Sequence, residues 1–450
     1  MKITIIGAGS LSFCPVTISD IFLNDNICSQ TLSIALMDIN EKFLGHSTYY
    51  CRRLCDFLKR SVEITSTTSL DKALENADFV ITAIEVARNY YWSQDFHIPR
   101  KYGFRQIYGE NGGPGGIFHA LRNFLPMLEI AQAMKRLCPD ALLLNYTNPE
   151  AKLVEMVFRE ISINIVGLCH GEQMGVNQLT ELLGMPREDL VTEVAGINHF
   201  GWFTKIEDCS GNDLYPLLKD KEKEFDWLAG WDELALPRIM LRTYGLWSYP
   251  GANHIGEYFA WSDGFIASPA MQYFFDPAFE DPWKDGKIPE FIYSLSANPT
   301  GRKLYRKDNE ISREAFKLNK KELKESGEYA IPVIEAISFS KPTKIGAINI
   351  INTGFAKGLP IDMAVEVPAV VDGNGIHPCQ TPQLPAAINA MIALQGTIHE
   401  LIYMAYKEKS RNKLLQAILL DPTVSSYNNA VALIDEMCEK QSTLLPELHW

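Results

Sequence analysis

Cysteine and histidine side chains follow two of the strands that the sequence predicts, and both residue types bind metal ions. Cys169 comes directly after the apolar run 163–168, and His199 comes soon after the run 194–197. Ligands bind at the carboxyl ends of the strands in a doubly wound sheet, so the thiol and the imidazole are expected to meet at one edge. Taken singly, a buried cysteine is more often a core residue, and a lone histidine is more often only hydrogen-bonded. Their shared place at strand ends therefore carries the prediction of a metal site.

Other polar groups are expected at the same edge. Asn148 follows the apolar run 141–144, and Glu110 lies in the glycine-dense loop 109–116, which leads into a helix that carries Arg122. A loop so rich in glycine often lies against a ligand, although it can equally be a flexible connection.

A short segment in the second half of the chain is dense in groups that can transfer a proton. His254, Glu257 and Tyr258 lie within five residues of one another. All three residue types serve as general acids or bases, although the segment can also be an ordinary helix or loop face.

A glycine-rich turn near the N-terminus predicts a dinucleotide site. Gly7, Gly9 and Ser10 stand between the predicted strand 2–6 and a helix, which is the context that such a site requires. Glycines let the backbone turn tightly and approach a pyrophosphate at the helix N-terminus. Asp38 closes the second strand, where a carboxylate binds ribose hydroxyls and favours NAD over NADP. The third glycine of the pattern is missing, and the alternative is a tight turn in an α/β fold that binds no nucleotide.

Strands alternate with helices over about the first 170 residues, which indicates βαβ units and a parallel sheet. After about residue 200 the pattern changes to polar and aromatic-rich segments, two strands and amphipathic helices. We therefore predict an α/β fold with an N-terminal Rossmann-like doubly wound parallel sheet and a C-terminal α+β domain. Residues 1–195 are expected to bind NAD, and residues 196–450 to serve the substrate, the metal and oligomerisation. The predicted strands are 2–6, 32–37, 62–65, 79–84, 141–146, 163–168, 344–352 and 363–371, and the predicted helices are 15–23, 41–58, 120–137, 150–161, 385–407, 411–420 and 430–438.

Composition excludes several classes of protein. The chain has 450 residues with 42 Lys plus Arg and 55 Asp plus Glu, so its formal net charge is −13. A chain this acidic is a poor candidate for nucleic-acid binding, which depends on cationic contacts with phosphates. It contains no run of 18 apolar residues that would cross a membrane, and its first residues do not resemble a signal peptide. The nine cysteines show no CxxC pair, and we expect reduced thiols and a cytoplasmic protein.

The whole chain resembles glycoside hydrolase family four, whose members are NAD- and metal-dependent glycosidases. This family departs from the two-carboxylate scheme of most glycosidases. The resemblance depends on seven motifs, which are Gly7-Ala8-Gly9-Ser10, Leu36-Met37-Asp38, Gly113-Pro114-Gly115-Gly116, Ala120-Leu121-Arg122, Asn145-Tyr146-Thr147-Asn148-Pro149, Gly167-Leu168-Cys169-His170 and Gly196-Ile197-Asn198-His199.

The resemblance implies an oxidative elimination. NAD⁺ takes a hydride from C3 of the sugar, a divalent cation such as Mn²⁺ polarises the sugar oxygens, and a base removes the C2 proton before the aglycone leaves. Water then adds and the hydride returns to C3. By the same resemblance Cys169 and His199 are metal ligands, Asn148 binds the sugar, and His170 donates a proton to the leaving oxygen. Glu110 stands where many relatives carry an aspartate.

The resemblance leaves the base and the sugar open. Tyr258 is the nearest match to the base of phosphoglycosidase members, Glu257 and His254 remain candidates, and some glucosidase-like members carry an aspartate where this chain has Ala252. His170 is typical of members that act on unphosphorylated sugars. Gly171 favours an α-glucosidase or α-glucuronidase, whereas the segment around His254 is more similar to the α-galactosidases.

We expect a hydrolase of α-hexopyranosides, most similar to the α-galactosidases, that works as a homodimer or homotetramer with no nucleic-acid or membrane partner. The alternative from another class is an NAD-dependent dehydrogenase of a small hydroxy acid or sugar, and a weaker one is a nucleotide-binding sensor. A simple dehydrogenase needs no metal, so the pair Cys169 and His199 favours the hydrolase.

Overall fold

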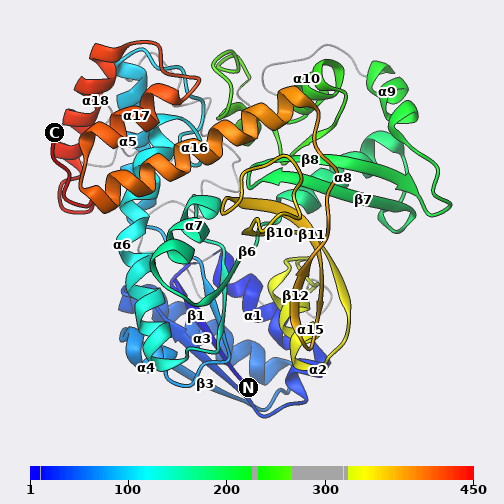
Figure 1. Ribbon diagram of the computed structural model, residues 1–450. Helices are drawn as coiled ribbons and strands as arrows, with labels where there is room; N and C mark the ends of the chain where they lie inside the picture. Colours follow the sequence, from blue (N-terminus) through cyan, green and yellow to red (C-terminus); the bar gives the residue numbers. More distant parts are fainter. Residues whose placement is uncertain (11, 225–231, 266–317, 319–322) are drawn as a thin grey trace.

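A single 12-stranded sheet runs through both halves of the chain in the computed structural model (Figure 1). The structure describes residues 1–10, 12–224, 232–265, 318 and 323–450. The strand order is β3-β2-β1-β4-β5-β6-β10-β11-β7-β8-β9, and β12 pairs with β11. The strands are β1 (Lys2–Ile6), β2 (Leu32–Met37), β3 (Val62–Thr67), β4 (Phe79–Thr82), β5 (Leu142–Asn145), β6 (Asn164–Gly167), β7 (Leu190–Ile197), β8 (Phe200–Asp208), β9 (Ser248–Tyr249), β10 (Thr343–Ile351), β11 (Ala364–Asp372) and β12 (Gly375–Pro378).

The first six strands are parallel and stand in the order 3-2-1-4-5-6, which is the Rossmann order. This confirms the predicted doubly wound sheet. The helices that connect and flank these strands are α1 (Phe13–Leu23), α2 (Asp25–Cys28), α3 (Glu41–Phe57), α4 (Leu70–Leu74), α5 (Arg88–Lys101), α6 (Gly113–Leu137), α7 (Glu150–Glu160) and α8 (Gly171–Leu183).

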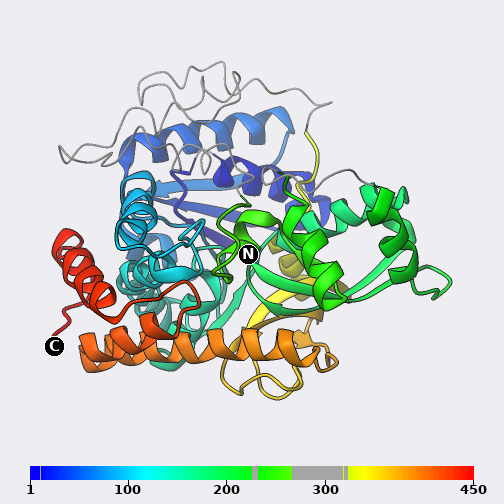
Figure 2. The same cartoon turned by 90° about the horizontal axis from the view of Figure 1, so that it is seen from above.

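Helices cover both faces of the parallel strands (Figure 2). Ile3 and Ile5 of β1 pack into a core shared with α1 and α3, whereas Ile6 and Val80 pack into a second core shared with α6 and α7. This two-sided burial explains why the strands are short continuous apolar runs rather than alternating ones.

The C-terminal half extends the sheet with antiparallel strands. β10 pairs with β6 at Asn349 and Gly167, and β11 pairs with β7 at Glu366 and Gly196. The boundary predicted at residues 195 and 196 lies inside β7, and the division into two domains stays a prediction. The remaining helices of the described residues are η1 (Arg187–Asp189), α9 (Tyr215–Glu224), α10 (Ala235–Tyr244), α11 (Ala252–Gly256), α15 (Ala330–Ser338), α16 (Ala386–Glu408), α17 (Arg411–Leu420) and α18 (Tyr427–Lys440).

Helix α5 is one of several helices that were not predicted, and helix α6 begins earlier than predicted. Helix α5 follows β4 directly, and its sequence lacks a clear apolar stripe. Helix α6 begins at Gly113 rather than at residue 120, with Pro114 in its first turn. A Cβ atom on Gly115 would lie 2.4 Å from the Asp95 carbonyl oxygen, so the glycines let α6 pack closely against α5.

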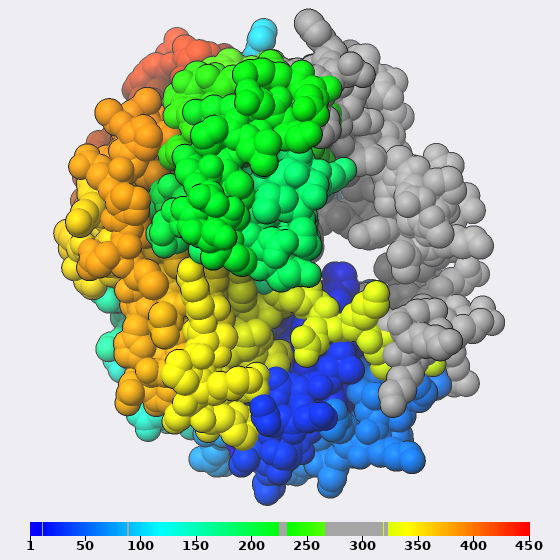
Figure 3. Space-filling view, turned by 90° about the vertical axis from the view of Figure 1, so that its right-hand side faces the viewer, coloured from blue at the N-terminus to red at the C-terminus, as the bar shows by residue number. Residues whose placement is uncertain are grey.

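The segment around α15 lies against the first helices of the chain, as the yellow and dark-blue atoms of Figure 3 show. Asn24 Nδ2 donates to Glu335 Oε2 at 3.2 Å, and the backbone N–H of Ser326 donates to Asp20 Oδ1 at 2.8 Å. Residues of the second half therefore pack against α1 and the start of α2. No helix among the described residues is long and apolar enough to cross a membrane.

Candidate functional site

The turn after β1 brings the four predicted dinucleotide-binding residues together. Gly7 has φ +88°, and a Cβ atom there would lie 2.2 Å from the Ala83 carbonyl oxygen, so the turn requires glycine. The backbone N–H of Gly9 donates to Asp38 Oδ2 at 2.8 Å, and Ser10 Oγ accepts the N–H of Phe13 at 3.1 Å. The residues fit a dinucleotide, because glycine leaves room for its phosphates and Asp38 can accept its ribose hydroxyls.

A buried carboxylate and two imidazoles form the group of described side chains that can hold a metal ion. Glu110 Oε2 lies 3.8 Å from His199 Nδ1 and 3.9 Å from His254 Nδ1, and the two imidazole centroids are 4.0 Å apart. One ligand atom from each residue lies within 4.8 Å of the other two. We call Glu110, His199 and His254 the metal group. Two imidazoles and a carboxylate fit a divalent transition-metal cation.

His199 lies at a different kind of position from the one that the sequence predicted. β7 is antiparallel to both β8 and β11, and His199 lies in the tight turn between β7 and β8 with φ +63°. The sequence pattern predicted that His199 follows a strand of the parallel sheet, but it follows an antiparallel strand instead. It joins Glu110, predicted as a substrate residue, and His254, predicted as a possible base.

Cys169 lies two residues after the end of β6 and outside the metal group. Its Sγ atom accepts the backbone N–H of Gly171 at 3.3 Å. Burial and the carboxylates of Glu150 and Glu366 raise the pKa of this thiol well above its usual value. Only the thiolate binds a metal, so Cys169 needs a cation beside it to act as a ligand. Its role as a metal ligand stays a prediction.

His170, the predicted proton donor, has a side chain that is 59% exposed, with Nδ1 3.4 Å from Glu328 Oε1. The hydrogen bond to Glu328 raises its pKa above the usual value, against the opposite effect of burial, and the charge of Glu110 adds to the increase. His170 is therefore within electrostatic reach of the metal group. An imidazole that stays protonated at higher pH suits the donation of a proton.

The three candidate bases near α11 face different neighbours. Tyr258 is buried, its hydroxyl donates to the Asn198 carbonyl oxygen at 3.2 Å, and its ring stacks on Phe200 at 4.7 Å. Burial, followed by the charge of Glu257, raises the Tyr258 pKa well above its usual value. His254 belongs to the metal group.

Glu257 is fully buried behind the glycine-rich loop. Its Oε1 atom accepts the backbone N–H groups of Glu110 at 2.6 Å and Asn111 at 2.8 Å. Burial, and then the charge of Glu110, raise the pKa of Glu257 to about 8.

The two remaining predicted substrate residues have different surroundings. Asn148 is half-buried after β5, and its carbonyl oxygen accepts Asn123 Nδ2 at 2.7 Å. Arg122 is 1% exposed and forms a double hydrogen bond with Asp95, at 2.6 and 3.1 Å, and a third with Gln441 at 2.9 Å. The guanidinium thus joins α6 to α5 and to the C-terminal segment.

Three residues that the sequence analysis missed surround the metal group. Asn111 Nδ2 lies 2.8 Å from His199 Nδ1, and Lys152 Nζ donates to the Asn111 carbonyl oxygen at 2.5 Å. His119 Nδ1 donates to the Glu110 carbonyl oxygen at 2.8 Å, and its Nε2 lies 3.1 Å from Glu85 Oε2. His119 stands three residues before Arg122, one turn earlier on α6, and a helix predicted from Gly113 would have revealed it.

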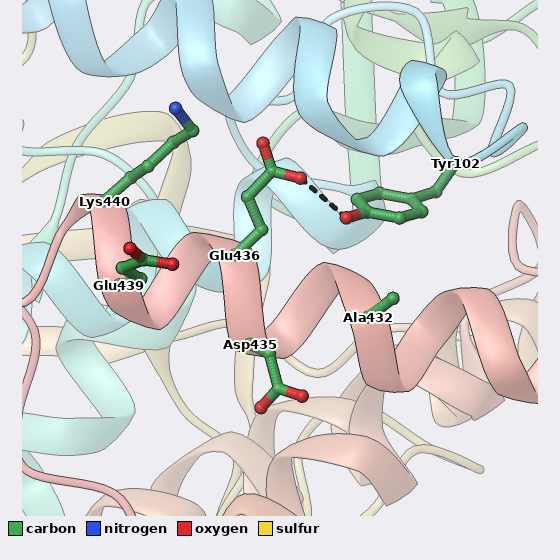
Figure 4. Close-up of a pocket in the computed structure, with 6 residues that line it drawn as sticks. All are labelled: Tyr102, Ala432, Asp435, Glu436, Glu439 and Lys440. Atoms are coloured by element: carbon green, nitrogen blue, oxygen red, sulfur yellow. Dashed lines mark hydrogen bonds between the residues drawn. The ribbon is translucent and has the colours of Figure 1, made fainter.

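A pocket elsewhere holds none of the predicted site residues (Figure 4). It lies between the end of α5 and α18, where the Tyr102 hydroxyl donates to Glu436 Oε2 at 2.6 Å. Its lining consists of Tyr102, Ala432, Asp435, Glu436, Glu439 and Lys440. The site is therefore defined by the metal group and the β1–α1 turn rather than by this pocket.

Comparison with solved structures supports the fold. The chain superposes on a 6-phospho-alpha-glucosidase from gut microorganisms, solved in complex with NAD and Mn²⁺, with a TM-score of 0.80. The two chains are 22% identical, and the superposition covers 100% of this chain and 99% of the other. The predicted architecture is thus confirmed as a known one.

Sequence comparison identifies the family. The chain is 32% identical over 453 residues to an alpha-galactosidase of Bacillus subtilis (strain 168), covering 99% of both proteins. It is also 32% identical over 462 residues to an alpha-glucosidase of Erwinia rhapontici, covering 99% of this chain and 98% of the relative. The family described as family 4 glycosyl hydrolase matches residues 2–185, and the C-terminal domain of that family matches residues 194–424. Because these two matches together span most of the chain, the protein belongs to family 4 of the glycosyl hydrolases and is a glycoside hydrolase.

Proposed function

We propose that the protein hydrolyses unphosphorylated α-hexopyranosides, with α-galactosides as the first choice and α-glucosides or α-glucuronides next, using NAD and a divalent cation such as Mn²⁺. The observation that carries the proposal is the metal group of buried Glu110 and His199 with half-buried His254, in a chain whose β1–α1 turn suits a dinucleotide. A plain dehydrogenase would need only the turn. Relatives solved with NAD and Mn²⁺ support the same pair of cofactors.

The bound dinucleotide supplies a reversible hydride acceptor for C3 of the sugar, and the cation supplies polarisation of the sugar oxygens. In this proposal Gly7, Gly9, Ser10 and Asp38 hold the dinucleotide. Asn148 orients the sugar.

His170 gives its proton to the glycosidic oxygen as the aglycone leaves. Its exposed side chain can reach a substrate, and the hydrogen bond to Glu328 raises its pKa. We assign Arg122 to positioning, because its guanidinium is already bonded to Asp95 and Gln441.

Tyr258 is our first choice for the base that removes the C2 proton. Glu257 already accepts two backbone N–H groups, and His254 belongs to the metal group, whereas the Tyr258 hydroxyl makes one hydrogen bond of 3.2 Å. That bond is to the carbonyl oxygen of Asn198. Asn198 directly precedes His199, which is a member of the metal group. A cation there would favour the phenolate and lower the pKa of Tyr258 from its raised value.

The charges around the metal group support a neutral sugar. Glu110 lies in the group, and Glu328 lies beside His170. A phosphate or carboxylate on the substrate would meet repulsion from these carboxylates. The two relatives at 32% identity are named for galactosides and glucosides, which agrees with neutral substrates but does not separate the two.

The nine cysteines are all free, in agreement with the reducing cytoplasm that the sequence predicts. Homodimer or homotetramer formation stays a prediction.

A panel of aryl α-glycosides tests the proposal. The protein is mixed with the galactoside, glucoside or glucuronide, NAD⁺ and Mn²⁺, and aglycone release and NADH absorbance are followed together. We expect aglycone release that requires NAD⁺ but leaves no net NADH. Stoichiometric NADH with an intact glycosidic bond would instead identify a dehydrogenase.

The same reaction in D₂O tests the elimination and its base. We expect deuterium at C2 of the released sugar, and a large loss of this exchange, on the order of 100-fold or more, in Tyr258→Phe. Normal exchange in this variant would move the base to Glu257 or His254. Hydrolysis without deuterium at C2 would contradict the elimination.

A further inference from the structure

Side chains from three other elements hold the backbone of the loop that carries Glu110. Glu257 Oε1 accepts the N–H groups of Glu110 and Asn111, His119 Nδ1 donates to the Glu110 carbonyl oxygen, and Lys152 Nζ donates to the Asn111 carbonyl oxygen. The three side chains are between 0% and 4% exposed. All four polar groups of these two residues' backbones are therefore fixed from outside the loop.

The loop held in this way presents two side chains to His199. Glu110 Oε2 lies 3.8 Å from His199 Nδ1, and Asn111 Nδ2 lies 2.8 Å from the same nitrogen. Glu110 Oε2 also lies 3.9 Å from His254 Nδ1. A shift of the loop backbone would therefore move a carboxylate ligand and an imidazole partner together.

Glu257 is placed to couple this loop to the third member of the metal group. It follows the short helix α11 directly, three residues after His254, so one turn of chain carries both the imidazole and the carboxylate. The loop approaches this turn very closely, because a Cβ atom on Gly112 would lie 2.6 Å from the Glu257 carbonyl oxygen and 2.7 Å from its Cβ atom. The contact thus needs glycine at position 112.

We propose that Glu257 is a positioning residue for the metal group, which holds Glu110 and Asn111 against His199 by accepting their backbone N–H groups, and that it is not the catalytic base. The inference rests on the proposed function for the identity of the cation. It explains why a carboxylate is buried at this point with two backbone N–H groups as donors to its Oε1 atom. Partners that orient metal ligands typically change metal affinity by about 10–100-fold when they are removed.

Direct titration of the full chain with Mn²⁺ alone, without NAD or sugar, tests the inference by the electron paramagnetic resonance signal of free Mn²⁺. Glu257→Ala removes the acceptor, and we expect its Mn²⁺ affinity to fall by about 10–100-fold. Glu257→Gln keeps an acceptor oxygen and should restore most of that affinity. NAD affinity, measured separately, should stay at the wild-type value in both variants.

Glu155→Ala is the matched control. Glu155 is also a buried carboxylate that accepts a backbone N–H, that of Ala364 at 3.0 Å, but its other partners are His399 and Arg159 rather than the metal group. This variant should unfold at a lower temperature while it keeps its Mn²⁺ affinity. Lys152→Met removes the donor to the Asn111 carbonyl oxygen and should weaken Mn²⁺ binding in the same direction, which gives a second test if Glu257→Ala does not fold.

Several results would overturn the inference. These are wild-type Mn²⁺ affinity in Glu257→Ala, an equal loss of affinity in Glu155→Ala, unchanged affinity in Glu110→Gln, or no Mn²⁺ binding by the wild-type protein. Failure of the proposed function has a different signature. If no glycoside is hydrolysed while Glu257→Ala still weakens Mn²⁺ binding and Glu257→Gln restores it, the positioning role stands and the hydrolase assignment falls.

Discussion

The turn after β1 and the loop before α6 both bring backbone N–H groups to a carboxylate, but the two carboxylates lie in different surroundings. Asp38 accepts the N–H of Gly9 at the half-buried edge of the sheet, and the next residue, Ile39, is 88% exposed. Glu257 accepts the N–H groups of Glu110 and Asn111 in the interior, where it is fully buried.

This difference in burial makes the contact of Asp38 exchangeable and the contacts of Glu257 permanent. Water and ligand can reach Asp38, so a ribose hydroxyl can replace or join its backbone partner. Glu257 has no such access, and breaking its hydrogen bonds would leave buried N–H groups without partners, which is costly. We infer that the turn is built to exchange partners during cofactor binding, whereas the loop is built to keep its geometry.

The largest expected effect comes from breaking the group that the loop supports. His199→Asn removes an imidazole shared by both proposed ligand sets, and asparagine tolerates the positive φ at this position. A Lewis acid stabilises the charge of the transition state by several kcal/mol. Its loss should therefore lower kcat by about a thousand-fold or more. Steady-state kinetics and Mn²⁺ titration measure the loss.

NAD affinity is the internal control for this variant, because the β1–α1 turn should be unaffected. A His199→Asn enzyme with normal Mn²⁺ affinity would show that the metal site is elsewhere. Cys169→Ser sharpens the result. Weaker Mn²⁺ binding in this variant would add Cys169 to the ligand set, whereas unchanged binding would leave Glu110, His199 and His254 as that set.

A smaller effect is expected from breaking the turn. A Cβ atom on Gly9 would lie 2.7 Å from Asp38 Oδ2, so Gly9→Ala should displace the carboxylate that receives the ribose. Loss of a hydrogen bond to a charged group costs about 1.5–3 kcal/mol, so NAD affinity should fall by about 10–100-fold. Mn²⁺ affinity should not change. Fluorescence titration with NADH measures the affinity of the variant for the dinucleotide.

Gly45→Ala is the matched control. Gly45 lies in α3 with nothing within 4 Å of an added Cβ atom, so this variant should keep its NAD affinity and gain about 0.5–1 kcal/mol of stability. If Gly9→Ala binds NADH normally, the turn is not the cofactor site.

The same contrast explains what the sequence could predict. Gly7, Gly9 and Asp38 belong to one βαβ unit, whose geometry is fixed by short connections and by apolar runs that are easy to recognise. The sheet order of β1 to β6 follows from the same local rules. The doubly wound parallel sheet was predicted correctly, although strand and helix ends differ by a few residues, and the role of Gly7, Gly9 and Asp38 in binding a dinucleotide stays a prediction.

The metal group could not be predicted because its members meet through tertiary contacts between distant segments. Glu110, His199 and His254 come from a loop, a hairpin turn and a one-turn helix. The sequence marked all three residues but gave them different roles, because no spacing rule connects them. The pairing of β7 with β8, which sets the place of His199, also depends on contacts that a single-sequence pattern does not contain.

The smallest expected effect concerns His170, whose side chain is more exposed than either of the two carboxylates. Its pKa is raised first by the hydrogen bond to Glu328, so the imidazole stays protonated above its usual pKa of about 6.5. If His170 donates the proton to the leaving group, activity is present below the raised pKa and is lost as the pH rises through it. Glu328→Gln removes the charge that raises this pKa, so the alkaline limb of the kcat profile should move to lower pH. The shift should be small, because the His170 side chain is 59% exposed and water screens the pair.

Asp372→Asn is the control, since it changes the exposed pair of His377 with Asp372, at 3.1 Å, in the same way and should leave the profile unchanged. An alkaline limb that stays in place in Glu328→Gln but vanishes in His170→Asn would keep His170 as the donor and assign its raised pKa to Glu110 instead.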